Sequence, residues 1–343
     1  MKVTIRDVAR AADVSVATVS RALNGTDTVS ADTLEHVLKI AREMDFVPHA
    51  GARSLSLRRT DTIGVLLPDL HGEYFSELIR GLDLGARGTG HHLLLSASHG
   101  DIAEAVAALR TMRSRVDGLV VMSPFADGES VSGALSGKVP LVMIGGSEGA
   151  GARFSVDNHA GALAVTRHLL EMGHRDIAFV SGPADNVDSR ERLRGYRDAH
   201  REAGIAPRPV VQGDFREDSG FEAGTLLLSN GLPDAVFAAN DAMAIGCLRA
   251  FRGAGLSVPG DVAIAGFDDI PMARLIEPAL TTAGIAIADM GREAIELCVA
   301  MVRGEAEAPE RRLFAPTLVI RASSGAKQER AAPPSRPIRE EVR

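Results

Sequence analysis

The chain has 343 residues, of which 45% are hydrophobic, and its formal net charge is −7. This composition excludes an intrinsically disordered chain. Cys247 and Cys298 are too few for a disulfide framework or, by themselves, for a four-ligand zinc site. No apolar run reaches the roughly 18 residues of a membrane helix, and the N-terminal residues lack the apolar stretch of a signal peptide. We therefore expect a cytoplasmic protein of two or three domains with no membrane partner.

Charge is distributed unevenly along the sequence. Residues 1–60 contain nine Lys and Arg and seven Asp and Glu, a balance of +2, which leaves −9 for the rest of the chain. A basic end on an acidic body is typical of a protein that meets a polyanion at one end. The excess is small, so charge alone leaves a solvated basic surface as an equal alternative.

The first sixty residues carry the pattern of three helices. Apolar and small residues recur at helical spacing over residues 5–12. Ser15 is a suitable N-cap for a second helix over 16–23, and Ser30 for a third helix that ends near residue 44. Two helices joined by a short turn, followed by a supporting helix, form the helix-turn-helix unit.

Such a unit binds DNA because a helix fits the major groove, where the N-terminal part of the second helix reaches base edges. Arg21 can pair with guanine or clamp a phosphate, whereas Thr18 and Asn24 are short groups suited to phosphates. The alternative is an ordinary three-helix bundle with no DNA role. The predicted DNA-binding residues of this unit are Thr4, Ser15, Val16, Ala17, Thr18, Ser20, Arg21 and Asn24.

Residues 3–24, which read VTIRDVARAADVSVATVSRALN, resemble the opening of the LacI family of bacterial transcriptional regulators. Residues 48–55, which read PHAGARSL, are similar to that family's hinge segment. The resemblance implies a hinge over residues 47–61 that forms a short helix on the operator and brings Arg53 and Leu55 to the DNA.

Leu55 matches the family's leucine that, paired between two subunits, pries open a central base step in the minor groove. Such a wedge costs a few kcal/mol of unstacking, which bending and extra contacts offset. The alternative for Leu55 is packing between hinge and body. The chain departs from the family at Asp13, where Gly or Asn is frequent. Gly51 costs about 1 kcal/mol of helix propensity relative to Ala, which makes ordering of the hinge more dependent on DNA.

Beyond the hinge, short apolar runs alternate with helical patterns. This alternation predicts parallel sheets covered on both faces, and two successive runs of about 100 residues predict two lobes. The predicted strands span 63–67, 91–96, 118–122, 140–144, 177–181, 235–239 and 262–266. The predicted helices span 74–88, 102–115, 160–172 and 189–203.

We therefore predict an α/β protein with an N-terminal all-α helix-turn-helix head and doubly wound parallel sheets. The body is similar to the two-lobed periplasmic-binding-protein-like core of the LacI family. The predicted divisions are a DNA-binding domain over 1–46, the hinge over 47–61, an effector-binding and dimerisation core over 62–324, and a disordered tail over 325–343. Within the core, the lobes span roughly 62–158 and 159–283, and the chain crosses back near the C-terminus.

In open α/β sheets a ligand binds at the carboxyl ends of the strands, so polar residues in those places are candidates for an effector site. The resemblance implies that Arg192 and Asp268 make its most recurrent polar contacts. An arginine fork donates to adjacent oxygens and a carboxylate accepts from hydroxyl groups, a combination that suits a polyol. The predicted effector-binding residues are His71, Tyr74, Phe75, Asp188, Arg192, Phe215, Asn240 and Asp268.

Each of these positions also has a structural interpretation. Arg192 and Asp268 form an architectural ion pair in the alternative, His71 is an exposed loop residue, and Phe215 belongs to the core. Asp241 is expected to cap the helix that follows it. The ligand class also stays open: polar groups favour a sugar or sugar derivative, whereas Phe75 and Phe215 suit a purine or nucleoside.

The sequence carries no catalytic constellation and predicts no metal and no cofactor. Gly-rich segments stand in the wrong context for a dinucleotide or phosphate loop, and His91 and His92 are adjacent, so their side chains point to opposite faces of a strand. The leading hypothesis is a repressor rather than an enzyme, a homodimer on a near-palindromic operator at the bacterial nucleoid, whose DNA affinity a small molecule controls. A solute receptor without DNA binding, an enzyme and a regulator controlled by a protein partner are the alternatives.

Overall fold

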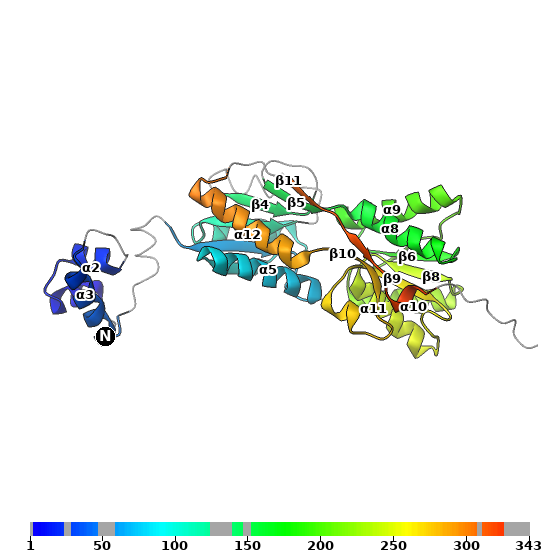
Figure 1. The fold of residues 1–343 in the computed structure, drawn as a ribbon, viewed down its shortest axis with the longest axis horizontal. Helices are drawn as coiled ribbons and strands as arrows, with labels where there is room; N and C mark the ends of the chain where they lie inside the picture. Colours follow the sequence, from blue (N-terminus) through cyan, green and yellow to red (C-terminus); the bar gives the residue numbers. More distant parts are fainter. Residues whose placement is uncertain are drawn as a thin grey trace, which may run out of the picture. The chain divides into compact units, whose positions relative to one another are not determined.

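The computed structural model describes residues 3–23, 29–46, 59–123, 139–146, 152–306 and 311–325 (Figure 1). The chain divides into two compact units, one of Met1–Thr62 with Arg115–Asp117 and one of Ile63–Ser114 with Gly118–Arg343. Asn24, Arg53 and Leu55, most of the predicted hinge and nearly all of the predicted tail lie outside the described residues.

The first unit contains the three predicted helices. Val8, Val19 and Val37, one from each helix, are fully buried against one another in a small apolar core. The helical spacing of these apolar residues therefore matches the packing of the unit. The helices are α1 (Ile5–Ala11), α2 (Val16–Leu23) and α3 (Ala31–Glu43).

Side-chain caps and one tight turn set the ends of these helices. The Ser15 hydroxyl accepts a hydrogen bond from the backbone N–H of Thr18 at 3.0 Å, and the Ser30 hydroxyl accepts one from Thr33 at 3.4 Å. Asp13, between α1 and α2, has a φ of +51°, a left-handed conformation that Asp tolerates better than most residues. The predicted caps and turn are thus confirmed.

The second unit is built on two six-stranded sheets, and the predicted α/β fold class is confirmed. The strands are β1 (Thr62–Leu67), β2 (His92–Ala97), β3 (Gly118–Met122), β4 (Leu141–Ile144), β5 (Ala152–Val156), β6 (Ile177–Ser181), β7 (Val211–Gln212), β8 (Ala235–Ala238), β9 (Ala263–Asp268), β10 (Thr281–Gly284), β11 (Arg311–Phe314) and β12 (Thr317–Val319). The helices are α5 (Glu73–Thr89), α6 (Ile102–Met112), α8 (Asn158–Glu171), α9 (Val187–Ala203), α10 (Glu217–Ser229), α11 (Asp241–Gly253) and α12 (Ile287–Arg303).

The first sheet has the strand order β11-β5-β4-β3-β1-β2, and β1, β3, β4, β5 and β11 pair in parallel. Helices α5 and α12 lie side by side against it (Figure 1). Their backbones approach so closely that a Cβ at Gly81 would lie 1.9 Å from the carbonyl oxygen of Ala288. A larger residue at Gly81 would separate α12 from α5.

The second sheet has the order β12-β10-β9-β8-β6-β7, with only the β10 and β12 pair antiparallel among its described pairings. Helices α8 and α9 pack as one pair and α10 and α11 as another (Figure 1). Every residue of β6, β8 and β9 is buried, as expected for parallel strands covered on both faces.

The chain passes between the two sheets more than once. It leaves the first sheet after β5 to form α8, returns after β10 to form α12, and ends with β11 in the first sheet and β12 in the second. The sequence interpretation assigned no element to 217–229 or 287–303. Gly220 and Gly224 weaken the helical signal of α10, yet they are the residues that let α10 pack closely on α11.

Candidate DNA-binding surface and ligand-binding cluster

The predicted DNA-binding face lies on the outer side of α2. Val16, Ala17 and Arg21 are exposed, and Val16 retains 42% of its accessible surface. Val19 and Ala22, on the opposite side, are buried. An exposed valine and an exposed arginine on the same short helix suit contact with base edges, including thymine methyl groups.

Two of the predicted DNA-binding hydroxyls also stabilise helix ends. The Thr4 hydroxyl donates to Asp7 Oδ2 at 2.7 Å, and this hydrogen bond lowers the pKa of Asp7. The Ser15 and Thr18 hydroxyl oxygens lie 2.8 Å apart. Thr4 and Ser15 therefore have a structural role at the helix ends. Thr18 and the half-buried Ser20 can offer their remaining hydrogen-bonding capacity to a phosphate.

Arg192 is the centre of a second cluster, in the second unit. Its side chain is 7% exposed and projects from α9. Nε donates to Asn158 Oδ1 at 2.8 Å, Nη1 donates to the carbonyl oxygen of Ala239 at 2.5 Å, and Nη2 lies 3.1 Å from Asp268 Oδ1. These contacts account for three of the five guanidinium N–H groups. We call Asn158, Asp188, Arg192 and Asp268 the Arg192 cluster.

Asp268 ends β9 in a strained backbone conformation. Its φ is +111°, and that of Asp269 is +56°, so two consecutive non-glycine residues lie in regions that disfavour them. Arg321 lies 2.6 Å from Asp269 and helps to hold this turn. Desolvation raises the pKa of Asp268 to about 6 although Arg192 lowers it, with Asp188 adding to the rise. Its buried Oδ1 is held in the ion pair with Arg192 Nη2 but has no hydrogen bond of regular geometry in the described residues, so it retains capacity to accept from a ligand hydroxyl.

Asp188 lies in the first turn of α9 and is tied to Arg192 through Asn158. The amide of Asn158 donates from Nδ2 to Asp188 Oδ1 at 2.9 Å while its Oδ1 accepts from Arg192. Desolvation raises the pKa of Asp188, and the nearby Arg192 opposes that rise. A Cβ at Gly145, beyond the end of β4, would lie 3.7 Å from Asp188 Oδ2. The ends of the two sheets therefore approach each other at this carboxylate.

Aromatic rings surround the guanidinium of Arg192. Its Cζ lies 3.8 Å from the ring centroid of Phe267 and 5.8 Å from that of Phe215, within cation–π range. Tyr74 and Phe75, at the start of α5, are half-buried and meet edge to face, with centroids 5.4 Å apart. Desolvation, with Asp268 and Asp188, raises the pKa of Tyr74, so its hydroxyl stays protonated and able to donate.

Asn240 and His71 stand apart from this arrangement. Asn240 caps α11, with Oδ1 accepting from Met243 N at 3.0 Å and Nδ2 donating to the Phe215 carbonyl at 2.9 Å. Both ends of its amide are thus engaged in the fold. His71 is exposed in the loop before α5, as in its structural interpretation. The expectation that Asp241 caps the helix was wrong, since Asn240 does so and the Asp241 carboxylate is fully buried.

Asn158 and Phe267 were missed as site residues by the sequence interpretation. Asn158 lies two residues after the end of β5, and the signal that could have found it is its position after a strand, which was not recognised over 152–156. Phe267 precedes Asp268 and was absorbed into the buried strand. His91 is buried, with Nδ1 3.0 Å from the Thr89 carbonyl oxygen, and His92 is exposed, so the two point to opposite faces as predicted.

Comparison with known proteins assigns the chain to a family. Residues 4–49 match the family described as bacterial regulatory proteins, lacI family, and residues 166–324 match the periplasmic binding protein-like domain. The ribose operon repressor of Escherichia coli strain K12 is 36% identical over 330 residues, covering 94% of this chain and 99% of that protein. The chain belongs to the LacI family. It is a DNA-binding transcriptional regulator, as the sequence predicts, and its relatives are regulators rather than enzymes.

Solved structures of LacI-family members match the fold over nearly the whole chain. The lac repressor dimer bound to operator and the anti-inducer ONPF superposes with a TM-score of 0.87 at 29% identity, covering 95% of this chain and all of that one (100%). The complex of the transcriptional regulator CelR with cellobiose has a TM-score of 0.70 at 33% identity, covering 94% of this chain and 100% of that chain. In the described part of this family member, no helix combines the length and apolarity needed to cross a membrane.

Proposed function

We propose that this LacI-family member is a homodimeric repressor whose two heads occupy the half-sites of a near-palindromic operator. A small molecule bound at the Arg192 cluster changes the affinity for that operator. The protein acts by binding and not by catalysis, in the cytoplasm at the nucleoid. The observation that carries the proposal is the buried ion pair of Arg192 and Asp268, in which the Asp268 carboxylate keeps capacity to accept and two guanidinium N–H groups make no polar contact within the described residues.

The effector is a neutral sugar or sugar derivative. Asp268 Oδ1 and the Asp188 carboxylate, which accepts a hydrogen bond from Asn158, can accept from hydroxyl groups. The two remaining N–H groups of Arg192 can donate to ring or hydroxyl oxygens. Polar groups of both kinds at one place suit a polyol, whose hydroxyls donate and accept. The CelR complex with cellobiose, which has this fold, supports the same class of ligand.

A purine or nucleoside is the second candidate, and a specific observation favours it. Phe215 and Phe267 lie within cation–π range of Arg192, and Tyr74, which senses the charge of Arg192, pairs edge to face with Phe75. Flat rings of this kind stack on bases. The two rings nearest the guanidinium, Phe215 and Phe267, already cover Arg192. The aromatic surface that remains suits the narrow flank of a sugar better than the wide face of a base.

Binding of the effector changes operator affinity only if the effector binds two conformations of the core with different affinity. Contacts between the two lobes would distinguish two such conformations. Glu73 Oε2 accepts from the backbone N–H of Met272 at 2.8 Å, and Arg216 lies 3.4 Å from Asp69. A ligand held by the Arg192 cluster would favour the arrangement in which these contacts are made.

The test has two independent parts. A duplex selected by the purified full-length protein from a randomised pool is titrated by fluorescence anisotropy against a scrambled duplex, and specific binding is expected. A thermal-shift panel then compares D-ribose, D-glucose and cellobiose with hypoxanthine and guanosine. A ligand at one hundred times its dissociation constant adds about 2.7 kcal/mol of stability. Stabilisation by nucleobases alone would contradict the sugar, and absence of a selected duplex would contradict the repressor.

A further inference from the structure

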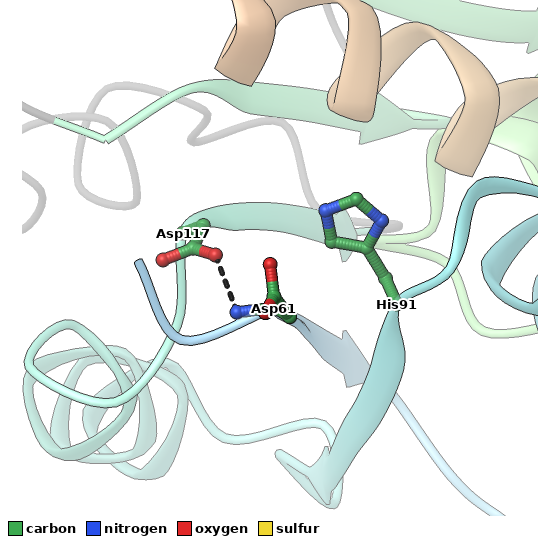
Figure 2. Close-up of side chains that lie close together, drawn as sticks. All are labelled: Asp61, His91 and Asp117. Carbon is green, nitrogen blue, oxygen red and sulfur yellow. Dashed lines mark hydrogen bonds between the residues drawn. The ribbon is translucent and has the colours of Figure 1, made fainter. Parts of the chain in front are cut away.

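The carboxylate of Asp117 closes a clamp on the residues that follow the predicted hinge. Asp117 Oδ1 accepts from the Thr60 backbone N–H at 2.7 Å and from the Thr60 hydroxyl at 3.0 Å. Oδ2 accepts from the Asp61 backbone N–H at 2.8 Å, the hydrogen bond drawn as a dashed line in Figure 2. The Asp117 N–H donates in turn to the Thr62 carbonyl oxygen at 2.8 Å. Four hydrogen bonds therefore join three consecutive residues to one aspartate.

The clamp supports a sharp turn of the backbone at Asp61. Asp61 has a φ of +48°, in the left-handed region, so the chain turns sharply at this residue. A carboxylate that accepts from two successive backbone N–H groups stabilises such a turn, because hydrogen bonds to a charged acceptor are stronger than those between neutral groups. Without Asp117, the backbone N–H groups of Thr60 and Asp61 lose their acceptors and the turn loses its main support.

The second sheet contains the matching clamp at Asp234. Its Oδ2 accepts from the backbone N–H groups of Arg175 and Asp176, both at 3.0 Å, and its own N–H donates to the Asp176 carbonyl oxygen at 2.8 Å. Asp117 directly precedes β3 and Asp234 directly precedes β8, and each clamp holds the residues ahead of the neighbouring strand, β1 or β6. The fold thus provides two aspartates that each accept from two successive backbone N–H groups ahead of a neighbouring strand, Asp117 through both carboxylate oxygens and Asp234 through Oδ2.

The two clamps differ in the segment that precedes the residues they hold. The segment held by Asp234 follows the end of α8 by a few residues, so it is already fixed at both ends. The segment held by Asp117 follows the predicted hinge, and the clamp there has an additional hydrogen bond from the Thr60 hydroxyl. This clamp lies where the end of the predicted hinge meets the start of β1 at Thr62, and Asp117 itself directly precedes β3.

We propose that Asp117 is a positioning residue for DNA binding: its carboxylate fixes the backbone of Thr60 and Asp61, the last two residues of the predicted hinge, and this local order strengthens specific binding to the operator. This inference rests on the proposed function as a repressor. Asp117 itself lies outside the predicted DNA-binding residues and acts through the backbone of the segment that it holds. The alternative is that Asp117 only stabilises the start of the sheet, as Asp234 does.

The test compares full-length Asp117→Ala with the matched variant Asp234→Ala. Both remove a carboxylate that accepts from two successive backbone N–H groups, so both are expected to lower the melting temperature by a similar amount. Hydrogen exchange of a peptide that covers residues 59–63 should accelerate at least tenfold in Asp117→Ala only. Affinity for the duplex selected by the unsubstituted protein should fall at least fivefold, while affinity for a scrambled duplex stays within twofold. Asp234→Ala should leave both affinities within twofold.

Asp117→Asn provides the second variant in case Asp117→Ala fails to fold. Asparagine has the same shape as aspartate and keeps one acceptor oxygen. The hydrogen-exchange rate and the operator affinity of this variant should therefore lie between those of the unsubstituted protein and of Asp117→Ala. The inference is overturned if the folded Asp117 variants bind the selected duplex as tightly as the unsubstituted protein, or if Asp234→Ala loses as much specific affinity. If the unsubstituted protein selects no duplex at all, the proposed repressor function fails, whereas accelerated exchange in Asp117→Ala would still establish the clamp.

Discussion

The outer face of α2 and the Arg192 cluster are both candidate binding sites, but they are built in opposite ways. The face of α2 is exposed, and its residues stand next to one another in the sequence from Val16 to Arg21. The Arg192 cluster is buried, and Asn158, Arg192 and Asp268 come from three separate elements. A rigid helix presents one site, whereas packing of the whole core assembles the other. Changes at α2 should therefore affect DNA alone, and changes in the cluster should affect ligand and stability together.

The largest effect is expected for Arg192→Ala. This change removes the positive charge that offsets the buried Asp268, so ligand binding should be lost, and breaking a buried pair typically costs about 3–5 kcal/mol of stability. Isothermal titration with the best ligand of the sugar panel and thermal unfolding measure both effects. Operator affinity without ligand should stay within threefold.

The matched control for Arg192 is Arg167→Ala, which removes an arginine whose ion pair with Glu202 is exposed. It should leave ligand affinity unchanged and alter stability by less than about 1 kcal/mol. Unchanged ligand affinity in Arg192→Ala would show that the effector binds elsewhere.

Arg21→Ala probes the other side of the comparison. Loss of an arginine that reads a base should cost about 1–3 kcal/mol of operator affinity and relax discrimination at one base pair. Ligand affinity should not change, because α2 belongs to the first unit and Arg192 to the second. Anisotropy with the selected duplex and its single-base variants measures this. Arg10→Ala, which removes an exposed charge from α1, is the control and should weaken both selected and scrambled duplexes alike.

The Arg192 cluster should also make ligand binding dependent on pH. The pKa of Asp268 is raised to about 6, and a hydroxyl donates a stronger hydrogen bond to the ionised carboxylate than to the neutral acid. Sugar affinity should therefore rise between pH 5 and pH 7, by up to about tenfold. Burial and Asp188 raise this pKa and Arg192 lowers it, while the charge of Asp268 in turn raises the pKa values of Asp241 and Tyr74. Asp268→Asn should bind more weakly and lose the dependence, and an unchanged pH profile in that variant would rule out Asp268 as the responsible group.

The same raised pKa has a defined consequence for stability. Between about pH 4 and pH 6 the folded protein keeps a proton on Asp268 that the unfolded chain releases, so the free energy of unfolding from this group falls as pH rises through that window. Above about pH 6 the contribution is constant. Urea unfolding of the unsubstituted protein and of Asp268→Asn, compared at pH 5 and pH 7, measures the difference.

The smallest effect is expected for Ser15→Ala. Loss of this N-cap should cost about 1 kcal/mol, or about fivefold in operator affinity, because α2 then frays at its N-terminus. Ser30→Ala removes the equivalent cap from α3 and is the control. It should lower the stability of the head to a similar extent and change operator affinity less, and an equal loss in both variants would assign the effect of Ser15 to folding alone.

Much of the fold follows from the sequence, and the reasons are local. The three helices of the head were predicted because apolar spacing and the caps Ser15 and Ser30 act within one or two turns of helix. Strands such as β3 and β6 were predicted because a short unbroken apolar run is typical of a strand that is buried on both faces. Helices α10 and α12 were not recognised, since close packing against α11 and α5 stabilises them and that packing depends on residues distant in the chain.

By itself, the sequence determined the local features of this protein: the helices of the head, the alternation of strands and helices, the family, and most of the residue types around the Arg192 cluster. Only the tertiary structure decided which of those residues meet. It placed Asn158 between Arg192 and Asp188, turned Asn240 into a helix cap, left His71 exposed, and brought Asp117 onto Thr60 and Asp61. The physical reason is range, because a cap or an apolar face depends on neighbours in the chain, whereas a buried hydrogen bond depends on strands and helices that pack only in the folded protein.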